Sequence, residues 1–185
     1  TPTPAPASDF ELPDLLLPVS LSLERFLLTD FRLTSAGDTV YALDRLELVA
    51  SLIDGRLKLD RLQLSGTDLS ASASGRLDAP DDYRSDLALD FETRLQDQAV
   101  TGAASLSGNL EAAALDLRLT EPVDLEIDLR GTRLLEAPRL ALDLRLAPVA
   151  LDALDPEWPA LTVASDLRLE LDSSGLRASG SLSAD

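Results

Sequence analysis

The chain of 185 residues contains no cysteine, no histidine and no methionine. The lack of cysteine excludes a disulfide framework and thiolate metal sites. The lack of histidine removes the commonest general base and the commonest zinc ligand. Because methionine is missing even at position 1, we expect a processed chain or a segment of a longer protein.

Positive charge is also scarce, because the chain has 16 basic residues against 33 acidic ones and a formal net charge of −17. This excess argues against binding to nucleic acid, whose phosphates would repel it, and against adsorption to anionic lipid surfaces. No apolar run approaches the roughly 18 residues that a membrane-spanning helix needs. The N-terminal TPTPAPAS is not a signal peptide. Any membrane anchor of a parent protein would therefore lie outside this sequence.

The clearest pattern is a short phrase that occurs three times. It reads LSLERFLL from Leu21, YALDRLEL from Tyr41 and LKLDRLQL from Leu57. On a helix, with about 100° per residue, its apolar positions would scatter around the cylinder. They fit two alternating strand segments whose parity switches at the acidic–arginine pair, and one extra residue is what a β-bulge supplies. The phrase therefore predicts strands with one apolar face.

The same one-sided alternation continues to the C-terminus and is interrupted by turn signals. Asp54-Gly55 predicts a type I′ hairpin, because both central residues of that turn need a positive φ. Further breaks are predicted at Ala36–Asp38, Ala79–Asp82, Gln96–Gly102 and Ser173–Gly175. Proline limits residues 149–159 to one short helical turn, for which Asp152 or Asp155 is the expected cap.

Together these patterns predict an all-β fold, a long antiparallel meander of about a dozen strands. We expect residues 1–14 to be a proline-rich linker or tail and residues 15–185 to be the β segment. Leucine dominates the apolar face and aromatic residues make up only 4% of the chain, whereas strands usually favour rings and β-branched residues. Such a face can be hidden in a closed sandwich or barrel, or it can stay partly open as a trough. Periodicity alone leaves both alternatives open.

The residues predicted to line an open groove are the apolar members of the alternating segments. They are Leu43, Leu46, Leu48, Leu57, Leu59, Leu62, Leu64, Leu87, Leu89, Phe91, Leu117, Leu125, Ile127, Leu142, Leu144, Leu167 and Leu169. In a closed sandwich the same side chains would be ordinary core.

Two stretches of the sequence carry a resemblance to a known family. The first is VSLSLERFLLTDFRL followed by VYALDRLELVASLIDGRLKLDRLQLSGTDLSASASGRL, and the second is WPALTVASDLRLELDSSGLRASGSLS. They resemble the repeat region of the TamB family, in the AsmA-like and bridge-like group of lipid-transfer proteins, over residues 15–185. The resemblance implies a β-taco, a repeating β-groove with an apolar interior and a polar outside. It also implies a periplasmic segment of an inner-membrane-anchored protein in a Gram-negative bacterium.

The function that this resemblance implies is not enzymatic. It is phospholipid transfer between the inner and outer membranes, with support for the assembly of outer-membrane proteins and autotransporters. The implied partners are phospholipid acyl chains, outer-membrane protein precursors and, through other parts of the parent protein, a TamA-like outer-membrane barrel; nucleic acid is not among them. The alternative is a structural scaffold or chaperone that binds nascent outer-membrane strands at its open edges without conducting lipid.

Two acidic groups could bind a hard cation through their carboxylate oxygens. They are Asp124, Glu126 and Asp128 on one strand, and Asp81, Asp82 and Asp86 near a turn. A solvated face and a turn are favoured instead, because acidic residues are mostly exposed. We expect no metal, no cofactor and no catalytic residue, since the serines at positions 70, 72 and 74 have no base at a recognisable spacing.

The acidic–arginine pairs and the lone tryptophan are the other distinctive residues of the sequence. The pairs Asp44-Arg45 and Asp60-Arg61 are predicted to mark surface steps between strand segments; an inward pair that regulates lipid access is the alternative. Trp158 is predicted to plug one end of the groove or to pack on a neighbouring repeat, with a partner anchor as the alternative.

Overall fold

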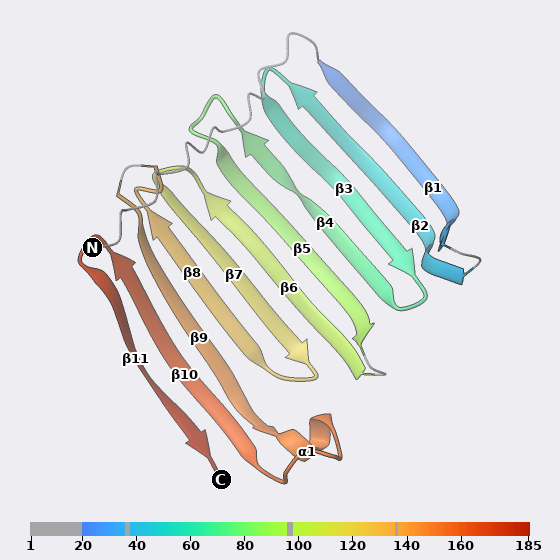
Figure 1. Ribbon diagram of the computed structural model, residues 1–185. Coiled ribbons are helices and arrows are strands. Elements are labelled where there is room, and N and C mark those ends of the chain that lie inside the picture. Colours follow the sequence, from blue (N-terminus) through green and yellow to red (C-terminus); the bar gives the residue numbers. More distant parts are fainter. Residues whose placement is uncertain (1–19, 36–37, 96–97, 136) are drawn as a thin grey trace.

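The computed structural model describes residues 20–35, 38–95, 98–135 and 137–185. These residues form one antiparallel sheet of 11 strands, and the order of the strands in the sheet is their order in the sequence (Figure 1). Strands β1 and β11 each pair with one neighbour only, so the sheet does not close on itself. The predicted all-β antiparallel meander is confirmed.

Each strand runs into the next through a short connection. The strands are β1 (Leu21–Ser35), β2 (Asp38–Ile53), β3 (Arg56–Gly66), β4 (Leu69–Asp78), β5 (Arg84–Leu95), β6 (Gln98–Gly108), β7 (Ala112–Glu121), β8 (Leu125–Thr132), β9 (Arg139–Ala150), β10 (Thr162–Asp172) and β11 (Gly175–Ala184). Over the described ranges, helix is confined to α1 (Leu151–Leu154), between β9 and β10. The linker predicted for residues 1–14 lies outside the described residues. Residues 36–37 of the break predicted at Ala36–Asp38 also lie outside them.

The acidic–arginine pairs lie where strands change parity. In β3 the register with β2 skips Asp60, which is the extra residue of a bulge. In β1 the acidic–arginine pair of its phrase lies opposite the single residue Val49 of β2. The pair Asp44–Arg45 differs, because Asp30 of β1 lies opposite Asp44 and the register between β1 and β2 does not shift there. Asp30 has a φ of +53°. The predicted bulges are thus confirmed in β1 and β3.

The turn chemistry is confirmed at one position and corrected at another. Asp54 and Gly55 have φ angles of +50° and +74°, as a type I′ hairpin requires. The break predicted over Gln96–Gly102 is shorter, because β6 begins at Gln98. Glycine at position 102 serves packing: a Cβ atom there would lie 2.7 Å from Cζ of Phe91 on β5. The aromatic ring therefore lies over a glycine of the next strand.

The short helical turn predicted within residues 149–159 is α1. Of the two aspartates expected to cap it, Asp155 is the C-cap residue, whereas the N-cap residue is Ala150 and makes no side-chain hydrogen bond. Asp152 lies inside the first turn, and Asp155 follows the helix as its C-cap. The carboxylate of Asp155 accepts a hydrogen bond from the Glu157 N–H at 2.9 Å and so fixes the loop after the helix.

Candidate functional site

One face of the sheet is apolar from the first strand to the last, and we call it the apolar face. Paired residues of adjacent antiparallel strands project from the same face of a sheet. One row of paired residues is Leu23, Ala50, Leu59, Gly75, Leu87, Leu106, Leu115, Leu129, Leu142, Leu169 and Ala178. The neighbouring row is Phe26, Leu48, Leu62, Ala73, Leu89, Ala104, Leu117, Ile127, Leu144, Leu167 and Gly180. Both rows cross all the strands without a polar residue.

The register brings all of the residues predicted to line a groove to this apolar face. Most belong to the two rows above or to the flanking rows that contain Leu57 and Leu64. Leu43 lies three residues before Leu46, beyond a change of parity, so alternation alone does not place it on this face. A Cβ atom on Gly66, which shares the apolar face with Leu64, would lie 3.7 Å from Cδ2 of Leu43. Leu43 therefore stays on the same face.

The apolar face is open to solvent. The described residues form one layer, and among them Leu43 is the sole buried hydrophobic residue, at 9% exposure. Leu57 and Leu89 each keep 37% of their surface exposed although they lie inside the sheet. Neighbours within the sheet shield the flanks of these side chains, and nothing in the described part of the chain covers their tips. The residues that the structure describes therefore form neither the closed sandwich nor the barrel that periodicity left open.

The opposite face, which we call the polar face, carries ion pairs between neighbouring strands. Arg56 Nε lies 3.1 Å from Asp78 Oδ2, which links β3 to β4. Arg76 Nη2 lies 3.2 Å from Asp86 Oδ2, which links β4 to β5. Exposed pairs of this kind contribute up to about 1 kcal/mol each. Their main consequence is to keep the polar face in water, because charged residues resist burial.

The most buried acidic side chain, Glu47 on β2, was not singled out by the sequence. It keeps 6% exposure and forms ion pairs with one arginine from each of the three copies of the repeated phrase. Arg25 Nε lies 3.5 Å and Arg61 Nη1 3.7 Å from Glu47 Oε1, while Arg45 donates a hydrogen bond to Oε2. The Arg45 hydrogen bond, aided by the charges of the other two guanidinium groups, lowers the pKa of Glu47 below its ordinary value.

This cluster corrects the interpretation of the acidic–arginine pairs. The arginines do lie at steps between strand segments, but their ionic partner is Glu47 rather than the adjacent aspartate. Asp60 is paired instead with Lys58 at 2.6 Å. Arg45 and Arg61 share the polar face with Ser65 and Val49, their partners on the neighbouring strand. The alternative of an inward pair on the apolar face is therefore wrong.

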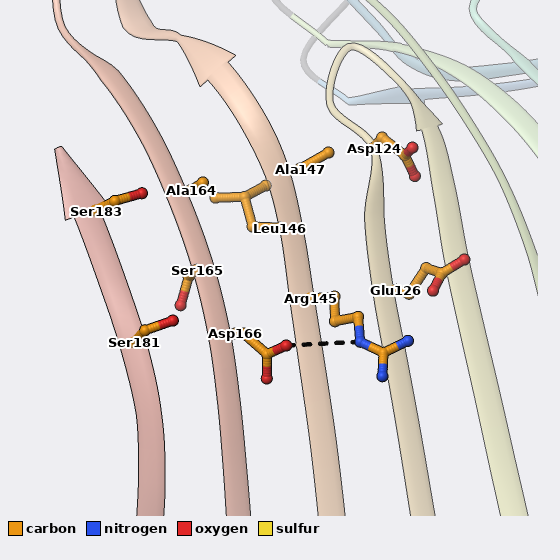
Figure 2. A pocket seen from close by; sticks show the side chains of 10 residues that line it. All are labelled: Asp124, Glu126, Arg145, Leu146, Ala147, Ala164, Ser165, Asp166, Ser181 and Ser183. Carbon is orange, nitrogen blue, oxygen red and sulfur yellow. Dashed lines mark ion pairs between the residues drawn. The ribbon is translucent and has the colours of Figure 1, made fainter. Parts of the chain in front are cut away.

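Shallow hollows of the surface lie on the polar face. One of about 390 Å³ spans β8 to β11, and Figure 2 shows the side chains that line it, with Arg145 and Asp166 forming an ion pair at 3.7 Å. Another of about 490 Å³ spans β5 to β8 and is lined by carboxylates, alanines, a serine and Arg118, together with Leu89, Leu117 and Ile127. These hollows arise where alanine and serine leave space between charged side chains. They have the character of a solvated outer surface.

Members of both acidic groups considered as cation sites are engaged in ion pairs. Glu126 pairs with Arg118, and Asp81 pairs with Arg84 at 3.1 Å. In the described ranges, no cluster of three or more acidic residues is arranged to hold a metal ion. The serines at 70, 72 and 74 lie on the polar face of β4, where Ser72 faces Gln63 and Asp90 on the neighbouring strands.

Trp158 lies in the loop that follows α1 and keeps 50% of its surface exposed. The path along the apolar face runs from β1 to β11, so its two ends are these edge strands. Trp158 lies in the connection between β9 and β10, on a long side of the sheet. Its backbone N–H donates to the Asp155 carbonyl at 3.0 Å. The prediction that it plugs an end of the groove is therefore wrong.

Comparison with known proteins agrees with this architecture. A family model described as TamB, N-terminal domain, matches residues 4–184. No solved structure matches the chain. Among the residues that the structure describes, no helix is long and apolar enough to cross a membrane. Since the match extends over nearly the whole chain, the protein belongs to the TamB family.

Proposed function

We propose that this chain provides an apolar path along which phospholipids move between the inner and outer membranes. In this proposal it is a periplasmic segment of an inner-membrane-anchored protein of a Gram-negative bacterium, and it supports the assembly of outer-membrane proteins and autotransporters. TamB proteins are membrane-associated bacterial proteins and are not a known enzyme family. The observation that supports the proposal most directly is that two apolar rows cross all 11 strands on an open face.

An acyl chain that crosses water meets a large free-energy barrier. Each CH₂ group transferred from water to an apolar surface is worth about 0.8 kcal/mol, so a chain of about fifteen carbons faces a barrier of about 12 kcal/mol in water. A continuous leucine surface removes part of that barrier at every point along the path. The phosphate head stays in water beside the sheet, because a charged group is costly to bury.

The length of the path follows from the strand count. Eleven strands leave ten spacings of about 4.8 Å, which gives an apolar path of about 48 Å across the sheet. This is shorter than the path of about 60 Å that a dozen strands or slightly more would give. The chain therefore supplies one stretch of a route between two membranes.

Photo-crosslinking tests the proposal. Crosslinkers are placed at Leu59, Leu89 and Leu144 on the apolar face. Matched controls are the preceding residues on the polar face, Lys58, Ala88 and Asp143. We expect phospholipid adducts at the three apolar positions and none at the controls. Equal labelling of the two faces, or no lipid adduct at any apolar position, would contradict an apolar path.

A second candidate function is supported by β11, which pairs with β10 alone among the described residues. Leu176 and Leu182 on this strand keep 66% and 74% of their surface exposed. An edge of this kind can pair with an extended segment of another protein, such as a nascent outer-membrane strand. Adducts with outer-membrane protein precursors alone, without lipid, in the crosslinking experiment would favour this scaffold or chaperone function.

A further inference from the structure

The outer edge of β11 carries main-chain groups that pair with nothing else in the described part of the chain. Thr162 of β10 and Asp185 exchange two N–H to carbonyl hydrogen bonds, at 2.8 and 3.1 Å. Along an antiparallel ladder such hydrogen-bonded pairs alternate with non-hydrogen-bonded pairs. The odd-numbered residues of β11 are therefore bonded to β10. The N–H and C=O groups of its even-numbered residues, from 176 to 182, point toward the outer edge.

This edge lacks the features with which proteins usually protect an edge strand. β11 pairs with β10 in one unbroken register, and Arg177 is the one charged residue between Gly175 and Ala184. The edge strand β1 differs, because its register with β2 shifts twice and it carries four charged residues. Bulges and charges discourage the addition of another strand. β11 is therefore the edge at which a further strand can add.

The sequence of β11 is complementary to a second copy of itself. Pairing two copies antiparallel about Ser179 places Leu176 of each copy opposite Leu182 of the other. The same register places Ala178 opposite Gly180. All four residues point their main-chain groups toward the outer edge, so the four pairs form about eight hydrogen bonds. Sliding the strands by two residues would separate the two leucines from each other.

The exposure of the leucines also favours a further strand. Leu176 and Leu182 keep 66% and 74% of their surface exposed. Leu171, which pairs with Leu176 from β10, has a strand on each side and keeps 42%. A flanking strand therefore lowers the exposure of a leucine in this row, and a second copy of β11 would supply that flank. On the polar face Arg177 would lie opposite Ser181, so no like charges would meet.

We propose that the outer edge of β11 is a dimer interface, at which two copies of this chain join antiparallel about a two-fold axis through Ser179. The axis is perpendicular to the sheet, so the interface is isologous and closes with two copies. Both apolar faces then lie on the same side. Ala178 and Gly180 end the two apolar rows of one copy, and each row continues into a row of the other. The interface does not depend on whether lipid moves along that face.

The dimer would double the sheet. Two sets of 11 strands leave 21 spacings of about 4.8 Å, which gives an apolar face of about 100 Å. Two chains with a formal net charge of −17 repel each other, and salt screens this repulsion. The main-chain hydrogen bonds and leucine contacts of the interface carry no net charge. Association should therefore strengthen as the salt concentration rises from about 0.05 M to about 0.5 M.

Single cysteines test the register, because the chain has none of its own. Position 179 would face its own copy in a non-hydrogen-bonded pair, with about 4.5 Å between the Cα atoms, which suits a disulfide. Ser181→Cys is the matched control on the same face of β11, because its two copies would lie about 14 Å apart. In the oxidised 185-residue chain, non-reducing gel electrophoresis should show the Ser179→Cys dimer forming roughly tenfold faster or more.

Charge substitutions test the association without a covalent bond. Ser181→Arg places like charges opposite Arg177 twice in the interface and should raise the dimer dissociation constant roughly tenfold, whereas Ser181→Asp should lower it. Within one chain the expected order is reversed, because residue 181 pairs with Asp166 of β10. An effect on folding alone would therefore have the opposite sign. The measurement is sedimentation velocity over a range of concentrations, with circular dichroism to confirm that each variant is folded.

Several results would overturn the dimer. They are a chain that stays monomeric at every concentration, equal disulfide formation by Ser179→Cys and Ser181→Cys, and charge variants in the reverse order. Association that grows beyond two copies would also overturn it, because it would involve a second surface. Dimers that weaken as salt rises would indicate contacts between charged surfaces instead. Lipid adducts at Leu59 test the apolar path separately, so either proposal can fail while the other stands.

Discussion

Replacing Leu89 with alanine measures how open the apolar face is. The substitution removes three carbons, worth about 2.4 kcal/mol if they were fully buried. Leu89 is 37% exposed, so roughly two-thirds of that value applies and the loss is about 1.5 kcal/mol. No cavity contribution is added, because the vacated space is continuous with solvent. In a closed core the same substitution costs about 2–5 kcal/mol, since a cavity remains.

The assay is urea unfolding followed by circular dichroism, with the free energy of unfolding extrapolated to water. Leu135→Ala, at a loop position that is 60% exposed, is the matched control and should cost less than Leu89→Ala. A loss of about 4 kcal/mol or more at Leu89 would refute an open face, because only a closed core produces it. A loss near 1.5 kcal/mol fits a side chain that is shielded on its flanks and free at its tip.

Leu89→Asp separates folding from lipid movement at the same position. A carboxylate at a site that is 37% exposed can reach water, so the chain should still fold. An acyl chain crossing that row would have to pass the charge, and lipid transfer should fall sharply. Ala88→Asp, on the polar face of the same strand, should leave transfer unchanged. If Leu89→Asp abolishes folding while Ala88→Asp does not, the face is buried and the reasoning fails.

Three further predictions concern other parts of the sheet. Because Arg45 holds the pKa of Glu47 below its ordinary value, Glu47 stabilises the fold at neutral pH, and this contribution is lost as pH falls through the lowered pKa. The free energy of unfolding of Glu47→Gln should therefore depend less steeply on pH over that acidic range. An unchanged slope would contradict the stabilising role of the Glu47 cluster. Gly102→Val should destabilise the chain by about 1–3 kcal/mol in urea unfolding, because its side chain would collide with Phe91. Acrylamide should quench the fluorescence of Trp158 readily, since half of its surface is exposed; strong protection would mean that it is covered.

The alternation of leucine with polar residues was sufficient to predict much of the fold. A period of two fixes which side chains share a face, and the acidic–arginine pairs mark where the parity changes. Asp54-Gly55 fixes a hairpin because few residue pairs adopt two successive positive φ angles. These signals are local, and local contacts with the next strand along the chain build the whole sheet.

What the sequence could not supply depends on register and on distant contacts. Alternation is the same whether a face meets a second layer or meets solvent, so the open face had to be observed. Glu47 is the middle residue of Leu27, Glu47 and Gln63, three paired positions in three copies of the phrase. Only the register of β1, β2 and β3 shows that one carboxylate forms ion pairs with three arginines. The contact of Gln98 with Leu154 joins residues far apart in the chain, which no local pattern reports.

The sequential order of the strands has a consequence for how function is distributed. Each added strand extends the apolar face by about 4.8 Å, and neighbouring strands contribute paired side chains to the same rows. A smaller apolar residue leaves a row apolar, as the alanines and glycines of β4 and β6 already do. A charge interrupts the row for every acyl chain that moves along it. The effect of a substitution on lipid movement should therefore depend on whether it makes the position more polar, rather than on which leucine is replaced. This dependence distinguishes a continuous surface from a discrete binding site.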